Sequence, residues 1–169
     1  MSSAGSSRRA WLLAGGLCAA VIVLDQVAKA IVRSEIVLGE EIDVLGPLGL
    51  THTHNTGVAF GLAGGTGVPL IIVMLAALGV VVYLFARDPA RPGMWVASGL
   101  LAGGAVGNLI DRIGAGHVTD FIELPPWPPF NVADVCITFG VVLLVLIYLR
   151  EGIREEREER ARKQGEKGG

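Results

Sequence analysis

Four long apolar stretches constrain this chain more than any other feature of its sequence. They cover residues 10–32, 68–86, 94–113 and 131–149, and each approaches the roughly 20 apolar residues that a helix needs to cross a bilayer. Only 18% of the residues are charged, against about a quarter in soluble domains. The sequence therefore predicts an all-α integral membrane protein with four transmembrane helices.

The positions of lysine and arginine predict how the chain is oriented. If the N-terminus is cytoplasmic, eleven of these residues flank the spans on the inside, and only Arg33 and Arg112 lie outside. We therefore expect one membrane domain over residues 1–150 with both termini in the cytoplasm. Two outer loops cover 34–67 and 114–130, and residues 151–169 form a charged tail, either a mixed-charge helix or a disordered extension.

A cleaved signal peptide is an alternative interpretation of the first apolar stretch, since arginines precede it and Cys18 lies inside it. Two observations argue against this. Leu17, before the cysteine, is not a small residue, and the apolar segment continues past Asp25 and Lys29. We therefore interpret the stretch as a membrane span.

Charge and cysteine content exclude several classes of protein. A net charge of −2, without a basic cluster in the body of the chain, excludes a strongly basic nucleic-acid binder. Two cysteines within apolar runs supply neither a disulfide framework nor a four-ligand zinc site. We expect no metal, no cofactor and no nucleic-acid partner.

Both outer loops carry recognisable local patterns. Ile42 and Val44 alternate with polar residues, a Gly-Pro turn follows, and residues 50–54 alternate again, which predicts a β-hairpin at the membrane surface. His52 and His54 then share one face of a strand, as a surface feature rather than a metal site, because no third ligand is evident. The second loop is expected to form a short surface helix or loop, with the proline-rich residues 125–129 extended at the headgroup level.

Polar residues within the spans all lie toward the outer side of the membrane in this orientation. Charges inside membrane helices are costly, so they face a protein interior, pair with one another or contact water. The set, taken with Asp120 of the second outer loop, comprises Asp25, Lys29, Asn108, Asp111, Arg112, Asn131 and Asp134.

Helical spacing indicates which of these residues share a face. Asp25 and Lys29 are i and i+4, so they either pair with each other to steady the first helix or contact a substrate directly. Asp111 and Arg112 are either a charged pair at a helix end or, for Arg112, a clamp on a carboxylate or backbone carbonyl.

Asp120 and Asp134 differ from the other acids, because each lies in an apolar context without a cation three or four residues away. Two carboxylates brought together in a low-dielectric site share a proton, so that one acts as general base on a water and the other as general acid. The alternative is structural: Asp120 caps a short surface helix, and Asp134 lies in the first turn of the fourth helix, where the helix dipole favours an acid.

Several blocks of sequence resemble those of the bacterial lipoprotein signal peptidases, the signal peptidase II or A8 family of aspartyl peptidases. The likeness covers about residues 10–150, and the blocks follow the family's order. They are Asp25-Gln26-Val27-Ala28-Lys29, Asn55-Thr56-Gly57-Val58-Ala59-Phe60-Gly61, Gly103-Gly104-Ala105-Val106-Gly107-Asn108-Leu109-Ile110-Asp111-Arg112, Val118-Thr119-Asp120-Phe121 and Phe130-Asn131-Val132-Ala133-Asp134.

The resemblance implies a bacterial cell-membrane endopeptidase with a small extracytoplasmic β-platform and its active site on that side. Its substrates are prolipoproteins, cleaved before a lipobox cysteine that already carries a diacylglyceryl group, and its partners are these precursors and membrane lipids. The resemblance makes Asp120 and Asp134 the catalytic pair. It places Asn55, Gly57, Asn108, Arg112 and Asn131 in the substrate groove, with Asp25, Lys29 and Asp111 supporting them, and we expect a monomer.

Two other classes of function remain open at this stage. A proton-coupled transporter would use Asp25, Lys29 and Asp134 as a relay, but it needs ionisable residues reachable from both sides and typically an inverted repeat. An interaction scaffold would clamp another membrane protein and have no activity on a lipopeptide.

Overall fold

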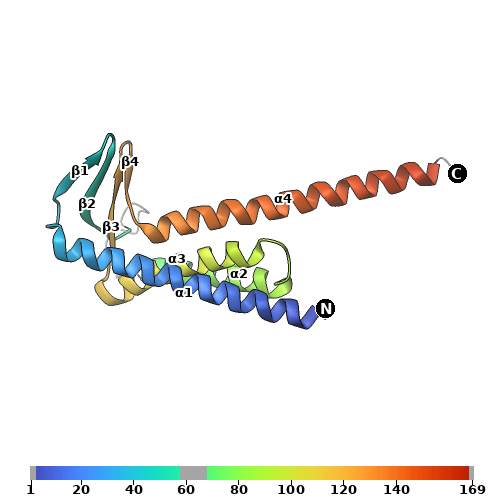
Figure 1. Ribbon diagram of the computed structural model, residues 1–169, viewed down its shortest axis with the longest axis horizontal. Coiled ribbons are helices and arrows are strands. Elements are labelled where there is room, and N and C mark those ends of the chain that lie inside the picture. Colours follow the sequence, from blue (N-terminus) through green and yellow to red (C-terminus); the bar gives the residue numbers. More distant parts are fainter. Residues whose placement is uncertain (1–2, 58–67, 168–169) are drawn as a thin grey trace.

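The computed structural model describes residues 3–57 and 68–167, which form helices and one antiparallel sheet (Figure 1). Residues 58–61 of the Asn55–Gly61 block lie outside the described residues. The helices are α1 (Ser3–Glu35), α2 (Val68–Arg87), α3 (Met94–Ala115) and α4 (Val132–Lys167), and the strands are β1 (Glu41–Leu45), β2 (Leu48–Asn55), β3 (Val118–Leu124) and β4 (Trp127–Phe130).

Each predicted apolar stretch forms a helix, and within the described residues three helices are long and apolar enough to cross a membrane. These spans are Gly5–Glu35, Val68–Arg87 and Val132–Gln164. Large apolar side chains such as Leu24 of α1 and Ile72 of α2 are 59% and 60% exposed, which suits helices that have lipid rather than water as their solvent. The apolar helices therefore fit a membrane location.

α3 is not among these three spans, because its many glycines and the polar residues at its end lower its hydropathy. It lies centrally and contacts α1, α2 and α4. A Cβ atom at Gly104 would lie 2.5 Å from the Ala133 carbonyl oxygen, and one at Gly107 would lie 2.7 Å from Oδ2 of Asp25. Small residues thus allow the backbones of α3 and α4 to approach closely, as is typical of helix packing in membranes.

The hairpin predicted in the first outer loop is confirmed: β1 and β2 pair antiparallel around a tight turn at Gly46. The second outer loop differs from the surface helix or loop expected. It forms a hairpin of β3 and β4, and β3 pairs with β2, so the sheet order is β1-β2-β3-β4. Of the proline-rich residues 125–129, which the sequence predicts to be extended, 127–129 lie in the edge strand β4, whereas 125–126 form the turn before it. Proline is tolerated in an edge strand because its missing N–H is not needed on the unpaired side.

The sheet lies at the end of the helices where α1 finishes and α4 begins (Figure 1). Val32 of α1 and Ile36, the residue after this helix, pack with Phe121 of β3 in a buried apolar cluster that joins the sheet to the helices. The N-terminus and the second half of α4 lie toward the other end. The polar residues that flank the sheet are therefore gathered at one end of the molecule.

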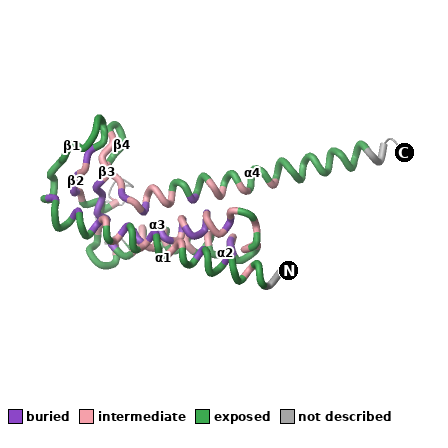
Figure 2. Tube along the Cα trace, in the orientation of Figure 1, coloured by how far each residue is buried: buried purple, intermediate pink, exposed green. Residues whose placement is uncertain are grey.

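The charged tail is a helix, which decides between the two predicted alternatives. α4 continues to Lys167 beyond the other helices, and its second half is exposed on every side (Figure 2). Ion pairs at i,i+4 join Arg154 to Glu158, Arg160 to Glu156 and Lys163 to Glu159. Such pairs stabilise a solvated helix by a few tenths of a kcal/mol each, about 0.2–0.5.

We predict that Gly104→Ala destabilises the protein by about 1–3 kcal/mol, because the added methyl group meets backbone on α4 rather than a flexible side chain. Gly79→Ala in α2 is the matched control. Its Cβ would have no heavy atom within 4 Å, so it should leave stability unchanged or raise it slightly. Unfolding in detergent checks both, and equal effects would contradict the close packing of α3 and α4.

Candidate active site

Asp120 and Asp134 come from two different elements at the sheet end of the helices. Asp120 lies in the middle of β3 and pairs with Thr53 of β2, so the alternative that it caps a surface helix is wrong. Asp134 lies in the first turn of α4, as expected. Its N–H donates to Oδ1 of Asn131 at 3.0 Å, and the Asn131 N–H donates back to Oδ2 of Asp134 at 3.2 Å. This reciprocal pair has the geometry of a helix capping box.

All three asparagines of the chain donate side-chain N–H groups to these two carboxylates. Asp120 accepts from Asn131 Nδ2 at 2.6 Å and from Asn55 Nδ2 at 2.9 Å. Asp134 accepts from Asn108 Nδ2 at 2.8 Å. Asn131 thus bonds to both acids, through its side chain on one and its backbone on the other. Helices α3 and α4 and strands β2 and β3 all contribute to one polar cluster.

The two carboxyl groups lie in different surroundings. Asp120 is only 2% exposed, and burial raises the pKa of its carboxyl above the ordinary value. The N–H groups of Asn55 and Asn131 oppose this, and the charge of Asp134 adds to it. Asp134 is partly exposed and lines a groove. One acid is therefore enclosed, whereas the other is open to a ligand.

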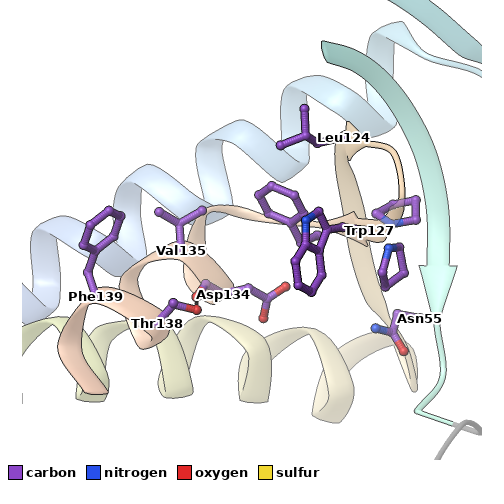
Figure 3. Close-up of a pocket in the computed structure, with 10 residues that line it drawn as sticks. Asn55, Leu124, Trp127, Asp134, Val135, Thr138 and Phe139 are labelled. Atoms are coloured by element: carbon purple, nitrogen blue, oxygen red, sulfur yellow. Dashed lines mark hydrogen bonds between the residues drawn. The ribbon is translucent and has the colours of Figure 1, made fainter. Parts of the chain in front are cut away.

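The groove beside Asp134 runs between α4 and the β3–β4 hairpin and has a volume of about 630 Å³. Figure 3 shows the Asp134 carboxylate pointing from α4 toward the space between Trp127 and Asn55. The walls are mostly apolar. They consist of Asn55, Leu124, Trp127, Pro128, Pro129, Phe130, Asp134, Val135, Thr138 and Phe139. An extended apolar ligand in this groove would pass directly beside a carboxylate.

A buried ion network between α1 and α3 contacts this polar cluster. Nζ of Lys29 lies 2.7 Å from Oδ2 of Asp25 and 3.0 Å from Oδ2 of Asp111. It also donates to Oδ1 of Asn108 at 2.9 Å. Asp25 and Lys29 are both fully buried, and Asp25 accepts the Ala133 N–H of α4 at 2.9 Å. The pair predicted from i,i+4 spacing therefore forms, and it ties α1 to α3 and α4.

Gly57 and Arg112 lie next to the carboxylate cluster without joining it. Gly57 has φ of +74°, which disfavours a side chain, and its N–H donates to Oδ1 of Asn55 at 2.9 Å. Nε of Arg112 is buried and has no hydrogen-bond partner within residues 3–57 and 68–167. Asp111 pairs with Lys29 and Arg33 instead of forming a surface pair with Arg112. Arg112 thus retains a donor for a ligand.

Sequence reasoning overlooked two residues of this site, Gln26 and Arg33. Nε2 of Gln26 donates to Oδ1 of Asp111 at 3.2 Å and to the Gly107 carbonyl at 3.1 Å. Arg33 donates to Oγ1 of Thr119 at 3.1 Å and lies 3.8 Å from Asp111. Two signals pointed to them: Gln26 is a polar residue within an apolar run, and Arg33 follows Lys29 by four residues.

The histidines on β2 share one face of the strand, as predicted. The rings of His52 and His54 lie 5.4 Å apart, and His54 also stacks on His117 at 3.6 Å. Among the described residues, no group of three or more His, Cys, Asp or Glu side chains is arranged to hold a metal ion. The cluster packs the platform against the loop after α3.

Comparison with known proteins identifies the family. The family model described as signal peptidase (SPase) II matches residues 17–150. The chain belongs to the signal peptidase II family. The lipoprotein signal peptidase of Syntrophomonas wolfei is 42% identical over 139 residues, which cover 81% of this chain and 93% of that protein. That of Symbiobacterium thermophilum is 44% identical over 137 residues, covering 77% and 90%.

Solved structures agree with this assignment. A bacterial membrane enzyme determined by the in meso method at 1.9 Å resolution is 34% identical, has a TM-score of 0.74 and covers 79% of this chain and 90% of its own. The expected family and the expected enzyme class are therefore confirmed. Membership of the signal peptidase II family favours a peptidase over the transporter and scaffold alternatives.

We predict that the carboxyl of Asp120 titrates above the ordinary aspartate value of about 3.9, as followed by ¹³C-carboxyl NMR. Asp134→Asn should lower the midpoint, since it removes a like charge, and Asn55→Ala should raise it, since it removes a donor to the ionised form. Shifts of the same sign in both variants would contradict this account.

Proposed function

We propose that this member of the signal peptidase II family removes the signal peptide from prolipoproteins by cleaving before the S-diacylglyceryl cysteine. One observation carries the proposal: Asn131 joins two carboxylates, and one of them, Asp134, lines an apolar groove at one end of apolar helices. A substrate with a signal peptide and acyl chains is itself apolar and embedded in the membrane. Its scissile peptide bond would lie at this polar rim.

The proposed reaction uses a water held between Asp120 and Asp134. One carboxylate takes a proton from the water, which attacks the peptide carbonyl carbon, and the other carboxyl protonates the leaving nitrogen. The raised pKa of Asp120 favours a shared proton, as the reaction requires. The apolar surroundings strengthen every electrostatic interaction at this point. The chemistry needs only the two carboxyl groups and water.

The neighbouring polar residues would bind and orient the peptide. We assign this role to Asn55, Gly57, Asn108, Arg112 and Asn131. Nε of Arg112, which has no hydrogen-bond partner among the described residues, is suited to a peptide carbonyl or to negative charge in the transition state. Asp25, Lys29 and Asp111 would support the site from within the helices, because their charges satisfy one another there.

We further propose that residues 1–150 form one membrane domain in which α3 is a fourth span, since it is 22 residues long and packed among the other helices. The excess of Lys and Arg at the end opposite the sheet supports cytoplasmic termini and an active site on the outer face of a bacterial cell membrane. Residues 151–169 would then be a cytoplasmic tail. We expect the enzyme to work as a monomer.

Asp120→Asn and Asp134→Asn should each lower kcat for cleavage of a lipidated prolipoprotein by roughly 10²–10⁴-fold, because each removes a proton acceptor or donor. Asp43→Asn, on an exposed part of β1, is the control and should retain activity. Circular dichroism establishes that all variants are folded. Near-normal cleavage by either dyad variant would overturn the assignment of the catalytic pair.

Cleavage should also require the lipid on the substrate. We expect the purified protein to process a diacylglyceryl-modified prolipoprotein and to leave the unmodified precursor intact, as followed by gel mobility and mass spectrometry. Equal cleavage of both substrates would show that the apolar groove does not select for acyl chains.

A further inference from the structure

The side-chain amide of Asn108 lies between the ammonium of Lys29 and the carboxylate of Asp134. The ammonium can only donate hydrogen bonds, and an ionised carboxylate can only accept them. Oδ1 of Asn108 accepts from Nζ of Lys29 at 2.9 Å and from Nδ2 of Asn131 at 3.2 Å, and its Nδ2 donates to Oδ1 of Asp134 at 2.8 Å. An ammonium has three N–H donors and no acceptor. A flipped amide would point its NH₂ group at the ammonium and its oxygen at the carboxylate. Lys29 and Asn131 therefore both donate to this oxygen, and together they fix which end of the amide meets Asp134.

Lys29 itself has little freedom to move. Its ammonium has three acceptors, which are Asp25 at 2.7 Å, Asn108 at 2.9 Å and Asp111 at 3.0 Å. These match its three N–H donors one to one. The residue is 0% exposed, so water does not compete for these bonds. The oxygen of Asn108 thus faces a fixed donor.

The other two asparagines are oriented by backbone groups instead. Oδ1 of Asn131 accepts the N–H of Asp134 at 3.0 Å, which leaves its Nδ2 for Asp120. Oδ1 of Asn55 accepts the N–H of Gly57 at 2.9 Å, which also leaves Nδ2 for Asp120. Among these three amides, that of Asn108 is the one whose oxygen accepts a hydrogen bond from a charged side chain.

We propose that Lys29 is a positioning residue that locks the Asn108 amide, so that Asp134 stays the ionised member of the pair and acts as the general base. This inference rests on the proposed function and specifies which acid takes the proton from water. A donated N–H stabilises a carboxylate over a carboxylic acid. Asp134 also stands in the first turn of α4, where the helix dipole favours negative charge.

Two other charged groups act on Asp134 from neighbouring elements. Asp120 of β3 opposes its ionisation, and Arg112 of α3 favours it through its positive charge. Lys29 differs from both because it acts through a hydrogen bond that passes along Asn108. A test must therefore remove this bond without changing the total charge.

Two double variants meet this requirement. Lys29→Met with Asp111→Asn removes one positive and one negative charge, together with the donor to Asn108. Arg33→Gln with Asp111→Asn changes the charge equally but leaves Lys29 in place, because Arg33 contacts Asp111 and Thr119 rather than Asn108. The pH profile of kcat/KM for a lipidated prolipoprotein is measured for both.

The acidic limb of the profile reports protonation of the base. We expect this limb to lie about 1–2 pH units higher in the Lys29 double variant than in the Arg33 double variant, the shift that corresponds to loss of one hydrogen bond to a charged group. Near neutral pH, kcat should fall while KM changes little. Superimposable acidic limbs would overturn the proposal, because a merely structural role predicts lower activity without a shift.

A second measurement uses the wild-type protein and does not depend on the folding of the Lys29 variant. In protein labelled with ¹⁵N-asparagine, the chain's three asparagines give three side-chain amide signals. We expect one of them, assigned to Asn108 by its loss in Asn108→Ser, to titrate with the acidic limb and to lose this response in Asp134→Asn. An Asn108 signal that ignores the state of Asp134 would overturn the proposal.

These experiments separate the inference from the function it rests on. If Asp120→Asn and Asp134→Asn still cleave, the catalytic pair itself is wrong. If both single Asp variants are inactive while the two double variants have the same acidic limb, the assignment of the catalytic pair is retained. The proposed role of Lys29 is then wrong.

Discussion

The buried ammonium of Lys29 is the constraint on which the rest of the site depends. A lone charge inside an apolar helix bundle costs several kcal/mol or more, so Lys29 requires acidic partners. Asp25 supplies one on the same helix and Asp111 one on α3, at 2.7 and 3.0 Å. Asp25 in turn holds the Ala133 N–H at the start of α4. Satisfying one charge thus sets where three helices meet.

From this junction, polar bonds extend toward the sheet. Lys29 holds Asn108, Asn108 holds Asp134, and Asn131 links Asp134 to Asp120 on β3. Because each amide has one orientation that satisfies its neighbours, the network has little freedom to rearrange. A preorganised set of donors around two acids is the arrangement that acid–base chemistry in a low-dielectric site needs.

Close packing makes this junction possible. Gly107 lies so near Asp25 that any side chain would displace the carboxylate, and Gly104 lies against the backbone of α4. The glycines that lower the hydropathy of α3 are therefore the residues that allow α1 and α4 to pack closely against it. α3 is in contact with α1, α2 and α4.

The sequence by itself determined the features that depend on local pattern. Apolar stretches determined the helices, alternation and a Gly-Pro turn determined the β1–β2 hairpin, and i,i+4 spacing placed Asp25 and Lys29 on one helix face. It also indicated Asp120 and Asp134 as unusual acids, because neither has a cation one helical turn away.

The tertiary structure decided which partners meet across the chain. Pairing of β2 with β3 joined the two outer loops in one sheet and placed Asp120 on an inner strand. Packing of α1 on α3 brought Asp111 into an ion pair with Lys29. Nε of Arg112 has no hydrogen-bond partner among the described residues. Strand pairing and ion pairing of this kind join residues more than 60 positions apart. Their energy depends on distance in space, which local periodicity does not encode.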